Sequence, residues 1–373
     1  MLTPPRPQSD VIIPPLTAVK GRGSLSNERS RFEAWRREPV YDDLGAEDSL
    51  PDQPARPKTT VWIQQAKSII STNQSPDVPF EASINPYQGC EHGCIYCYAR
   101  PSHAYLGLSP GLDFETRLFA KKNAAALLES ELANKNYVPK AITVGANTDP
   151  YQPIEREYKI TRSILEVMER YQHPVTIITK SGVVVRDIDI LERMAKKNLA
   201  RVFVSITSLK NEIARTLEPR ASAPARRLAT VKQLAEAGIP VGVLMSPIIP
   251  TITDVEIESV VAAAADAGAS YCGYILLRLP REIKDLFGEW LQEHFPLRAK
   301  HIESLLMQMR GGKVYDAAFG TRMKGTGVFA DLLSKRFKLA CQKHGISNER
   351  VELRTDLFVR PSKSAPSPQM ALF

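Results

Sequence analysis

The sequence predicts an α/β fold in which helices cover a parallel sheet. Short runs rich in apolar and β-branched residues alternate with amphipathic stretches, and the short runs are nearly continuously apolar. Such runs are typical of strands that are buried on both faces, as in a parallel sheet. The 373 residues, 43% of them hydrophobic, suffice for one large α/β domain with extensions or for two ordinary domains. A partial barrel and a doubly wound sheet both fit this pattern.

The strands and helices can be assigned by residue range. We expect strands at 80–84, 141–145, 175–179, 201–206, 240–245 and 271–277. We expect helices between them at 115–134, 157–171, 187–198, 224–238 and 254–268. In the second helix, Ile160, Ile164 and Met168 fall on one face, as expected for a helix that packs on a sheet. Gly238 and Gly268 are typical helix stops.

The two ends of the chain differ from this centre. Residues 1–60 hold nine of the 28 prolines and are expected to form a mostly disordered arm, with a short helix near 30–37. The α/β domain, as a partial barrel or a doubly wound sheet, is expected at 61–280. A mainly helical extension is expected at 281–360, with a late strand at 351–358, and a disordered tail at 361–373.

The composition indicates the cellular compartment and the class of partner to expect. No apolar run reaches the ~18 residues of a membrane span, and the start lacks the apolar core of a secretory signal. The five cysteines are an odd number, three of them clustered, which fits a reducing compartment. We therefore expect a cytoplasmic protein. The net charge of +8 favours polyanionic partners such as nucleic acid. Six basic residues of the C-terminal helices either form a basic rim or are ordinary solvated helix charges, which is the more common case: Arg322, Lys324, Lys335, Arg336, Lys338 and Lys343.

Cys90, Cys94 and Cys97 form a Cys-x₃-Cys-x₂-Cys motif after the first expected strand. Four thiolates complete the coordination of a structural zinc or an iron–sulfur cluster, whereas three leave one metal position open for a small molecule. Zinc with His92 or His103 as fourth ligand is the alternative, but zinc sites usually combine two separated ligand pairs. The two other cysteines, Cys272 and Cys341, are expected to be buried small hydrophobic residues.

Polar residues follow each of the later strands. They occur at 146–151, 179–182, 205–208 and 246–247 and at Arg278. Because ligands bind at the carboxyl ends of parallel strands, these residues are expected to meet on one face.

The cysteine spacing, with Tyr96 before the last cysteine and a β–α series after it, resembles the radical S-adenosylmethionine (SAM) superfamily over about residues 80–280. The stretches 93–99, 148–155, 178–181 and 246–250 are similar to the spore photoproduct lyase branch, whose members are often labelled DNA repair photolyases. The resemblance implies a partial (β/α)₆ barrel, a [4Fe–4S] cluster and SAM. It also implies reductive cleavage of SAM to a 5′-deoxyadenosyl radical, which abstracts hydrogen from a substrate not yet identified.

The resemblance also assigns residues and partners. It makes Cys90, Cys94 and Cys97 the cluster ligands and places Tyr96 beside the cluster and adenine. Lys180 is expected to meet the SAM carboxylate. Nucleic acid is a candidate substrate, and a one-electron donor such as flavodoxin or ferredoxin is expected.

Other residues have two interpretations at this stage. Ser205 is expected in the SAM pocket, or its hydroxyl bonds to nearby backbone. Glu218 and Arg220 are expected to reach the SAM ribose or carboxylate, or to form a surface ion pair. The three neighbours Asn147, Thr148 and Asp149 are expected near the ribose or the substrate.

The chain departs from spore photoproduct lyase at one position. Tyr98 matches a tyrosine of that enzyme's hydrogen relay, but the relay cysteine at the end of the second strand is missing from this chain. Thymine-dimer repair by the same route is therefore not expected. A rival hypothesis is a non-catalytic nucleic-acid-binding protein stabilised by zinc or by an iron–sulfur cluster.

Overall fold

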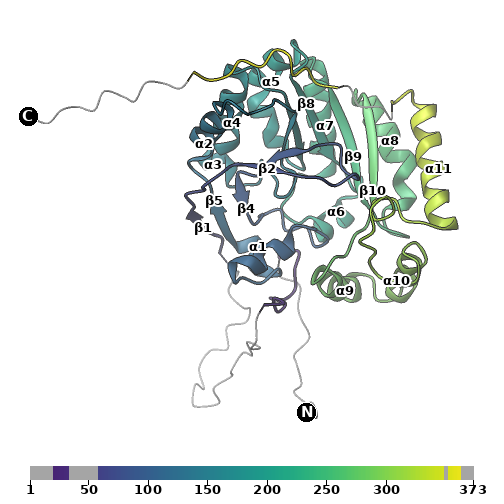
Figure 1. Ribbon diagram of the computed structural model, residues 1–373. Helices are drawn as coiled ribbons and strands as arrows, with labels where there is room; N and C mark the ends of the chain where they lie inside the picture. The colour runs from purple at the N-terminus through teal and green to yellow at the C-terminus, as the bar shows by residue number, and fades with distance from the viewer. Residues whose placement is uncertain (1–19, 33–57, 348–351, 363–373) are drawn as a thin grey trace, which may run out of the picture.

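A seven-stranded sheet in the order β10-β9-β8-β7-β6-β3-β2 forms the centre of the molecule (Figure 1). The computed structural model describes residues 20–32, 58–347 and 352–362. The strands are β2 (Ile70–Thr72), β3 (Ala82–Ile84), β6 (Ile142–Val144), β7 (Val175–Thr179), β8 (Ala200–Ser205), β9 (Val241–Ile248) and β10 (Tyr271–Leu276). All pairs are parallel except β2 with β3. Each of the six expected strands is present within a few residues, and the α/β class is confirmed.

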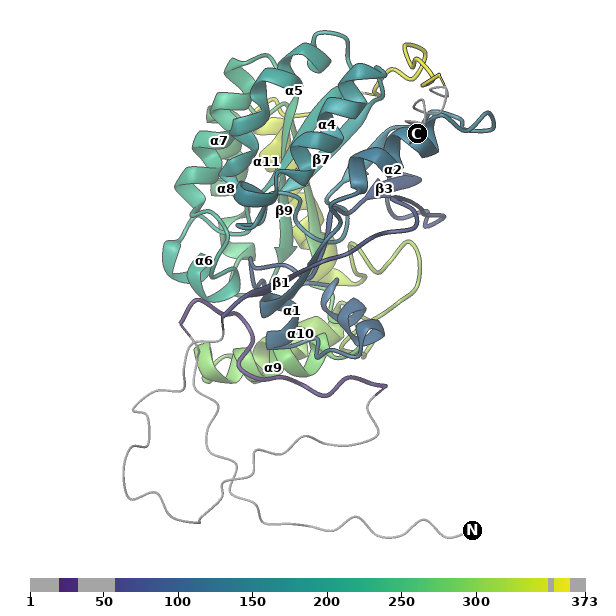
Figure 2. The same ribbon diagram turned by 90° about the vertical axis from the view of Figure 1, so that its left-hand side faces the viewer.

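Helices cover the outer face of this sheet (Figure 2). They are α2 (Ala124–Leu132), α3 (Glu155–Tyr158), α4 (Ile160–Arg170), α5 (Ile188–Ala195), α7 (Pro224–Glu236) and α8 (Ile257–Asp266). In α4 the face formed by Ile160, Ile164 and Met168 is buried, as the 3.6-residue period predicts. The C-terminal region is helical, with α9 (Ile283–His294), α10 (Ala299–Gln308) and α11 (Val328–Lys343). Among the described helices, none has the length and apolar character that crossing a bilayer requires.

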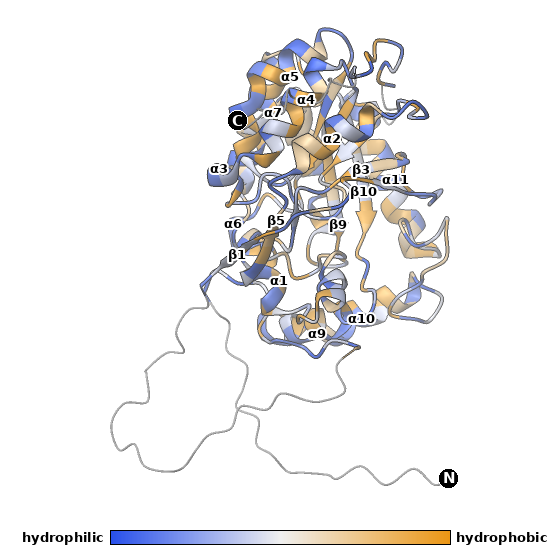
Figure 3. Ribbon diagram, turned by 60° about the vertical axis from the view of Figure 1, so that its left-hand side comes forward, coloured by the Kyte–Doolittle hydropathy of each residue, from blue (hydrophilic) through white to orange (hydrophobic). Residues whose placement is uncertain are grey.

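The sheet has one apolar and one mixed face. Strand residues such as Ile142, Val175 and Val202 are buried under the helices, and Figure 3 shows the strands as mainly hydrophobic. On the inner face, the register aligns Ser83, Thr143, Thr176 and Arg201 across four neighbouring strands. This polar row lines a cavity in place of a packed core. The sheet does not close, because β2 and β10 are its two edges.

A second, three-stranded sheet was not expected from the sequence. It joins β1 (Thr60–Ile63), β5 (Arg117–Ala120) and β4 (Tyr87–Gln88). The strand β5 and the short helix α1 (Leu112–Thr116) replace the start of the helix expected at 115–134. The signal for β5 was a two-residue alternation, in which Leu118 and Ala120 are buried.

The predictions for the ends of the chain were partly wrong. Residues 20–32 are not a solvated tail, because Ser24 is 0% exposed and Leu25 is buried. Most of the helix expected near 30–37 lies outside the described residues, as does most of the tail at 361–373. The late strand is absent from the described residues 352–358. In that segment the backbone pairs with the main body through single hydrogen bonds, such as Arg354 N–H to the Asn198 carbonyl at 3.0 Å.

Candidate functional site

The cysteine loop lies at the carboxyl edge of the parallel sheet, directly after β4. The Cys90 amide donates to the Phe114 carbonyl at 2.9 Å and the Ile95 amide to the Leu217 carbonyl at 3.1 Å. Gly89 and Gly93 have φ values of 75° and 67°, which L side chains rarely adopt. A Cβ at Gly93 would lie 2.7 Å from a Glu115 carboxylate oxygen. Both glycines are therefore needed for the tight path of the loop.

A buried ion pair between Arg100 and Glu115 stabilises the cysteine loop. The Arg100 guanidinium donates to the carbonyls of Cys94 at 2.8 Å and Gly93 at 3.1 Å and to the Glu115 carboxylate. Glu115 also accepts from the amides of Gly23 and Ser24 at 3.0 and 2.9 Å. Both charged side chains are 0% exposed. A buried charge is tolerated when its partners satisfy it in this way, so the network fixes the loop and residues 20–32 together.

Gln152 and Glu91 also stabilise the cysteine loop. The Gln152 amide group donates to the Gly89 carbonyl at 3.1 Å and accepts from the Glu91 amide at 2.9 Å. The Glu91 carboxylate pairs with Arg220 at 2.9 Å. Arg220 therefore contacts the cysteine loop, and its amide donates to the His92 carbonyl at 3.2 Å.

The three thiols lie close enough to influence one another. Burial, followed by the charge of Asp149 and then by the neighbouring thiols, raises the pKa of Cys90. Burial, followed by the charge of Glu218 and then by Cys97, raises the pKa of Cys94, and burial also raises the pKa of Cys97. Thiolates at this loop therefore require a cation as partner.

The thiols do not converge on a single point. Across the described ranges, no three His, Cys, Asp or Glu side chains come together closely enough to hold one metal ion. A tetrahedral zinc brings its sulfur ligands to about 3.8 Å from each other, since Zn–S bonds are about 2.3 Å long. A four-iron cluster takes its ligands from separate corners, so a wider spacing suits it. His103 contacts the Arg117 carbonyl at 2.8 Å and His92 faces Asp149 at 3.3 Å. The three thiol donors fit three corners of such a cluster.

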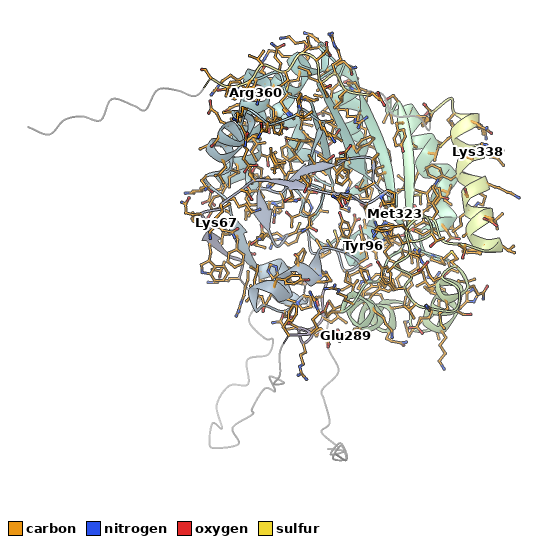
Figure 4. The ribbon with its side chains drawn as sticks, in the orientation of Figure 1. Lys67, Tyr96, Glu289, Met323, Lys338 and Arg360 are labelled. Atoms are coloured by element: carbon orange, nitrogen blue, oxygen red, sulfur yellow. The ribbon has the colours of Figure 1, made fainter. Side chains whose placement is uncertain are left out.

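Tyr96 belongs to a buried network beside the loop. Its hydroxyl donates to the Glu218 carboxylate, which also accepts from the Thr207 hydroxyl at 2.7 Å and pairs with Arg227. Glu218 and Arg227 are 3% and 1% exposed. The alternative of a surface ion pair between Glu218 and Arg220 is therefore wrong, because each has a different partner. Figure 4 shows Tyr96 in the interior of the molecule.

Lys180 and Ser205 lie side by side at the ends of β7 and β8. The register pairs Thr179 with Val204, so the residues that follow are neighbours on the inner face of the sheet. The Lys180 ammonium lies 5.8 Å from the centre of the Tyr96 ring. Burial lowers the pKa of Lys180, but Cys94 and Glu218 outweigh burial and raise it. Within the described part of the chain, Lys180 forms no ion pair.

In the loop after β6, one residue lines the cavity and its neighbours form hydrogen bonds with the protein. Asn147 lines the cavity, whereas the Thr148 hydroxyl donates to the Tyr87 carbonyl at 2.7 Å. Asp149 accepts from the Thr179 hydroxyl and the Lys180 amide, both at 2.7 Å. Burial would raise the pKa of Asp149, but the nearby His92 and these hydrogen bonds lower it to about 2. Thr148 and Asp149 thus position neighbouring loops, and their expected contact with the ribose or the substrate stays a prediction.

A cavity of about 970 Å³ opens next to the cysteine loop. It is lined by the inner face of the sheet, by the turn between β2 and β3, and by residues 322–324 and α11. Tyr98 lies at its wall with its side chain 49% exposed and its hydroxyl bonded to the Ala146 carbonyl. The Arg278 guanidinium lies 5.6 Å from the centre of the Tyr98 ring. The cavity therefore gives a ligand access to residues directly after the last cysteine.

Comparisons with known proteins agree with this geometry. The sequence profile of the radical SAM superfamily matches residues 84–264. Residues 84–264 form a radical SAM domain. Enzymes of this family use a [4Fe–4S] cluster and SAM and need an electron donor.

Relatives of known sequence do not define the substrate. An uncharacterized protein of Mycobacterium bovis is 33% identical over 221 residues, which cover 59% of this chain and 65% of that protein. The chain thus spans somewhat less than two thirds of that relative. An uncharacterized protein of Methanocaldococcus jannaschii is 27% identical over 232 residues, which cover 62% of this chain and 82% of that protein.

Solved structures show the same fold. A spore photoproduct lyase mutant with bound AdoMet and dinucleoside spore photoproduct has a TM-score of 0.55 at 17% identity, covering 80% of this chain and 84% of that chain. Another mutant of spore photoproduct lyase has a TM-score of 0.54 at 18% identity, with the same coverage. The partial barrel predicted from the sequence is thereby confirmed.

Several residues of the site could not be found by sequence reasoning. Arg100, Glu115, Gln152 and Arg227 hold the cysteine loop and Tyr96 through buried hydrogen bonds. A charged residue in a loop or helix normally lies in solvent, so its type alone gives no signal. The one available signal was position, because Arg100 directly follows the stretch 93–99 and Gln152 lies within the stretch 148–155.

Proposed function

We propose that this chain is a radical SAM enzyme in which Cys90, Cys94 and Cys97 ligate three irons of a [4Fe–4S] cluster. The observation that carries the proposal is a rigid loop with three thiols at the ligand-binding edge of a parallel sheet, beside an open cavity. When bound and reduced, the cluster supplies the electron that cleaves SAM to a 5′-deoxyadenosyl radical, which abstracts hydrogen from the substrate. The protein orients the reactants and excludes water.

The inner ends of β7 and β8 are proposed to hold SAM. Lys180 offers an ammonium group without an ion-pair partner among the described residues, which suits the SAM carboxylate. Ser205 stands next to it on the same face. The Tyr96 ring forms a wall beside Lys180, and Glu218 fixes that ring through its hydroxyl. Arg220 and Glu218 are proposed to act through the loop and the ring, because their side chains are held by Glu91 and Arg227.

The substrate is proposed to be nucleic acid, held in the cavity with Tyr98 at the reacting end. The lining combines aromatic and basic side chains, a combination that suits bases and phosphates. The spore photoproduct lyase structure named above holds a dinucleoside, which supports the same class. Of the six residues expected in the basic rim, Arg322, Lys324 and Lys338 line the cavity. Arg336 instead pairs with Glu258.

The hydrogen chemistry is proposed to differ from that of spore photoproduct lyase. In the loop after β6, Gly145 has a φ of 90°, and a Cβ there would lie 2.5 Å from the Ile178 carbonyl oxygen. This position excludes a cysteine side chain on steric grounds. Tyr98 is proposed to remain as the residue that faces the substrate, with a modified or rearranged product in place of a repaired dimer.

Anaerobic reconstitution tests the proposal against the rival binding protein. The chain is loaded with iron and sulfide, reduced with dithionite and mixed with SAM, and 5′-deoxyadenosine is measured. The proposal expects 5′-deoxyadenosine, and flavodoxin or ferredoxin is expected to replace dithionite as donor. A fully loaded, reduced protein that leaves SAM intact would contradict the proposal and support a metal-stabilised binding protein.

A further inference from the structure

Arg278 is the basic residue of the cavity whose guanidinium is least satisfied by the protein. It follows β10 and lies over Tyr98 on the wall of the cavity. Its two terminal nitrogens reach only the Met323 sulfur and the Tyr315 hydroxyl, both at 3.5 Å. Its Nε is buried without a hydrogen-bond partner. A half-buried guanidinium with these weak contacts gains from an anionic partner.

No carboxylate of the described residues fills this role. The cavity is lined by five cationic residues, Arg201, Arg278, Arg322, Lys324 and Lys338. The one acidic residue among the described lining residues is Asp77, which accepts from the Gly320 amide at 2.7 Å and pairs with Arg322. The buried guanidinium of Arg310 adds to the positive field, because Arg278 together with burial lowers the pKa of Arg310. The end of the cavity at Arg278 is thus positive and open to an anion.

Aromatic side chains share the cavity with these cations. Phe80, Tyr98, Phe203, Tyr271, Tyr274 and Phe337 lie in its lining. Gly242 makes room for two of the rings, since a Cβ there would lie 2.6 Å from Phe203 and 3.1 Å from Tyr271. Figure 4 shows Met323 near the strand β10 and Lys338 on α11. Aromatic rings next to guanidinium groups stack bases and neutralise phosphates in single-stranded nucleic acid.

We infer that Arg278 binds a phosphate of the substrate and thereby places the adjoining nucleoside against Tyr98. This inference rests on the proposed function and deepens it, because it names the group of the substrate that is recognised. The phosphate belongs either to a polynucleotide backbone or to a free nucleotide, and both present the same oxygens. A bidentate arrangement suits the planar guanidinium, whereas a lysine supplies only a point charge.

The test is equilibrium binding to the anaerobic, cluster-loaded protein without turnover. The probe is a fluorescein-labelled single-stranded DNA of about ten nucleotides, followed by fluorescence anisotropy at several salt concentrations. Unlabelled nucleoside 5′-monophosphates and the corresponding neutral nucleosides compete with it. We expect the monophosphates or longer oligonucleotides to compete and the nucleosides to fail. Competition by monophosphates as strong as that by oligonucleotides identifies a free nucleotide; stronger competition by oligonucleotides identifies the polymer.

Arg278→Gln is expected to weaken binding about 10- to 100-fold and to lower the slope of log K against log salt by about 0.7, the loss of one phosphate contact. Arg278→Lys keeps the charge and is expected to keep the slope while losing part of the affinity. Arg193→Gln removes an exposed arginine on the outer helix α5 and is the matched control, expected to bind as wild type. Iron content of every variant reports correct folding.

Two results overturn the inference. One is wild-type affinity and slope in Arg278→Gln with normal iron content. The other is a wild-type protein that binds no phosphate probe or binds neutral nucleosides equally well. Neither result depends on SAM cleavage. A failed proposed function appears separately, as a loaded wild-type protein that forms no 5′-deoxyadenosine.

Discussion

The arginine beside the cysteine loop and the arginine at the far end of the cavity differ in the hydrogen-bond partners that the protein provides. On the loop side, Arg100 donates to four carbonyls and a carboxylate and is 0% exposed. On the cavity side, Arg278 has two contacts of 3.5 Å and an Nε without a partner. Both carry the same guanidinium group. The protein itself supplies the partners of Arg100, whereas a ligand is proposed to supply those of Arg278.

This difference separates the proposed cofactor site from the proposed substrate site. A cofactor site needs ligands that are held in place before binding, and buried hydrogen bonds provide that rigidity. A substrate site needs groups whose hydrogen bonds are completed only by the correct molecule. The loop side is therefore proposed to hold the cofactors, and the cavity side is proposed to hold the substrate. The following variants test this division.

The largest effect is expected from Cys94→Ser. The variant removes one of the three proposed iron ligands, so we expect loss of most iron and of all SAM cleavage. Iron per protein and 5′-deoxyadenosine are the measurements. Cys341→Ala, which alters a buried cysteine in α11, is the control and is expected to keep its iron. A full iron complement with SAM cleavage in Cys94→Ser would remove this residue from the ligand set.

Glu218→Ala is expected to destabilise the fold by about 3–5 kcal/mol. It leaves the guanidinium of Arg227 buried without its carboxylate and frees the Tyr96 hydroxyl. Denaturant unfolding of the protein measures the change. Glu192→Ala breaks the exposed pair with Lys196 and is expected to cost less than about 1 kcal/mol. Equal losses in the two variants would mean that the Tyr96 network contributes no more than a surface pair.

Lys180→Ala is expected to weaken SAM binding about 10- to 100-fold while iron content stays intact. The reason is that one charge-assisted bond is lost, and the lysine is proposed to touch SAM and not the cluster. Titration of the loaded protein with SAM measures the affinity. Lys196→Ala, at the exposed residue that follows α5, is expected to bind SAM normally. Loss of iron in Lys180→Ala would place the lysine at the cluster instead.

Asp149 is expected to give the smallest of these effects, with a defined pH dependence. Its pKa is lowered from 3.8 to about 2 in the folded protein. A lowered pKa stabilises the fold above the unfolded value, so the contribution of about 2 kcal/mol is present above pH ~4 and is lost as the pH falls toward 2.

Iron-free protein is the material for that measurement, because clusters dissolve in acid. The difference in unfolding free energy between wild type and Asp149→Asn is expected to be about 2 kcal/mol at pH 7 and to shrink between pH 4 and pH 2. A difference that is constant over this range would show that the carboxylate charge of Asp149 does not stabilise the fold.

The sequence predicted the main sheet because its strands are strongly patterned. Val175–Thr179 and Ala200–Ser205 are apolar and β-branched, and each is followed by polar residues. The same pattern predicted that Lys180 and Ser205 lie at the ends of strands on one edge, since parallel strands share one carboxyl edge. Periodicity failed for β5, where four residues alternate too briefly to be told from a helix start.

The residues that form hydrogen bonds around the cysteine loop could not be predicted, because they are far apart in the sequence and meet only in the folded protein. Glu115 bonds to Gly23, 92 residues away, and Tyr96 bonds to Glu218, 122 residues away. Residues 20–32 looked like a polar tail, but a Cβ at Gly23 would lie 1.8 Å from the Gly93 carbonyl oxygen. A glycine that meets another backbone this closely reads in sequence like any flexible linker residue.

Electron paramagnetic resonance of the reduced, anaerobically loaded protein tests the central claim most directly. Three protein thiolates leave one iron without a protein ligand, so added SAM is predicted to bind there and change the spectrum of the reduced cluster. A reduced cluster whose spectrum is the same with and without saturating SAM would contradict the account.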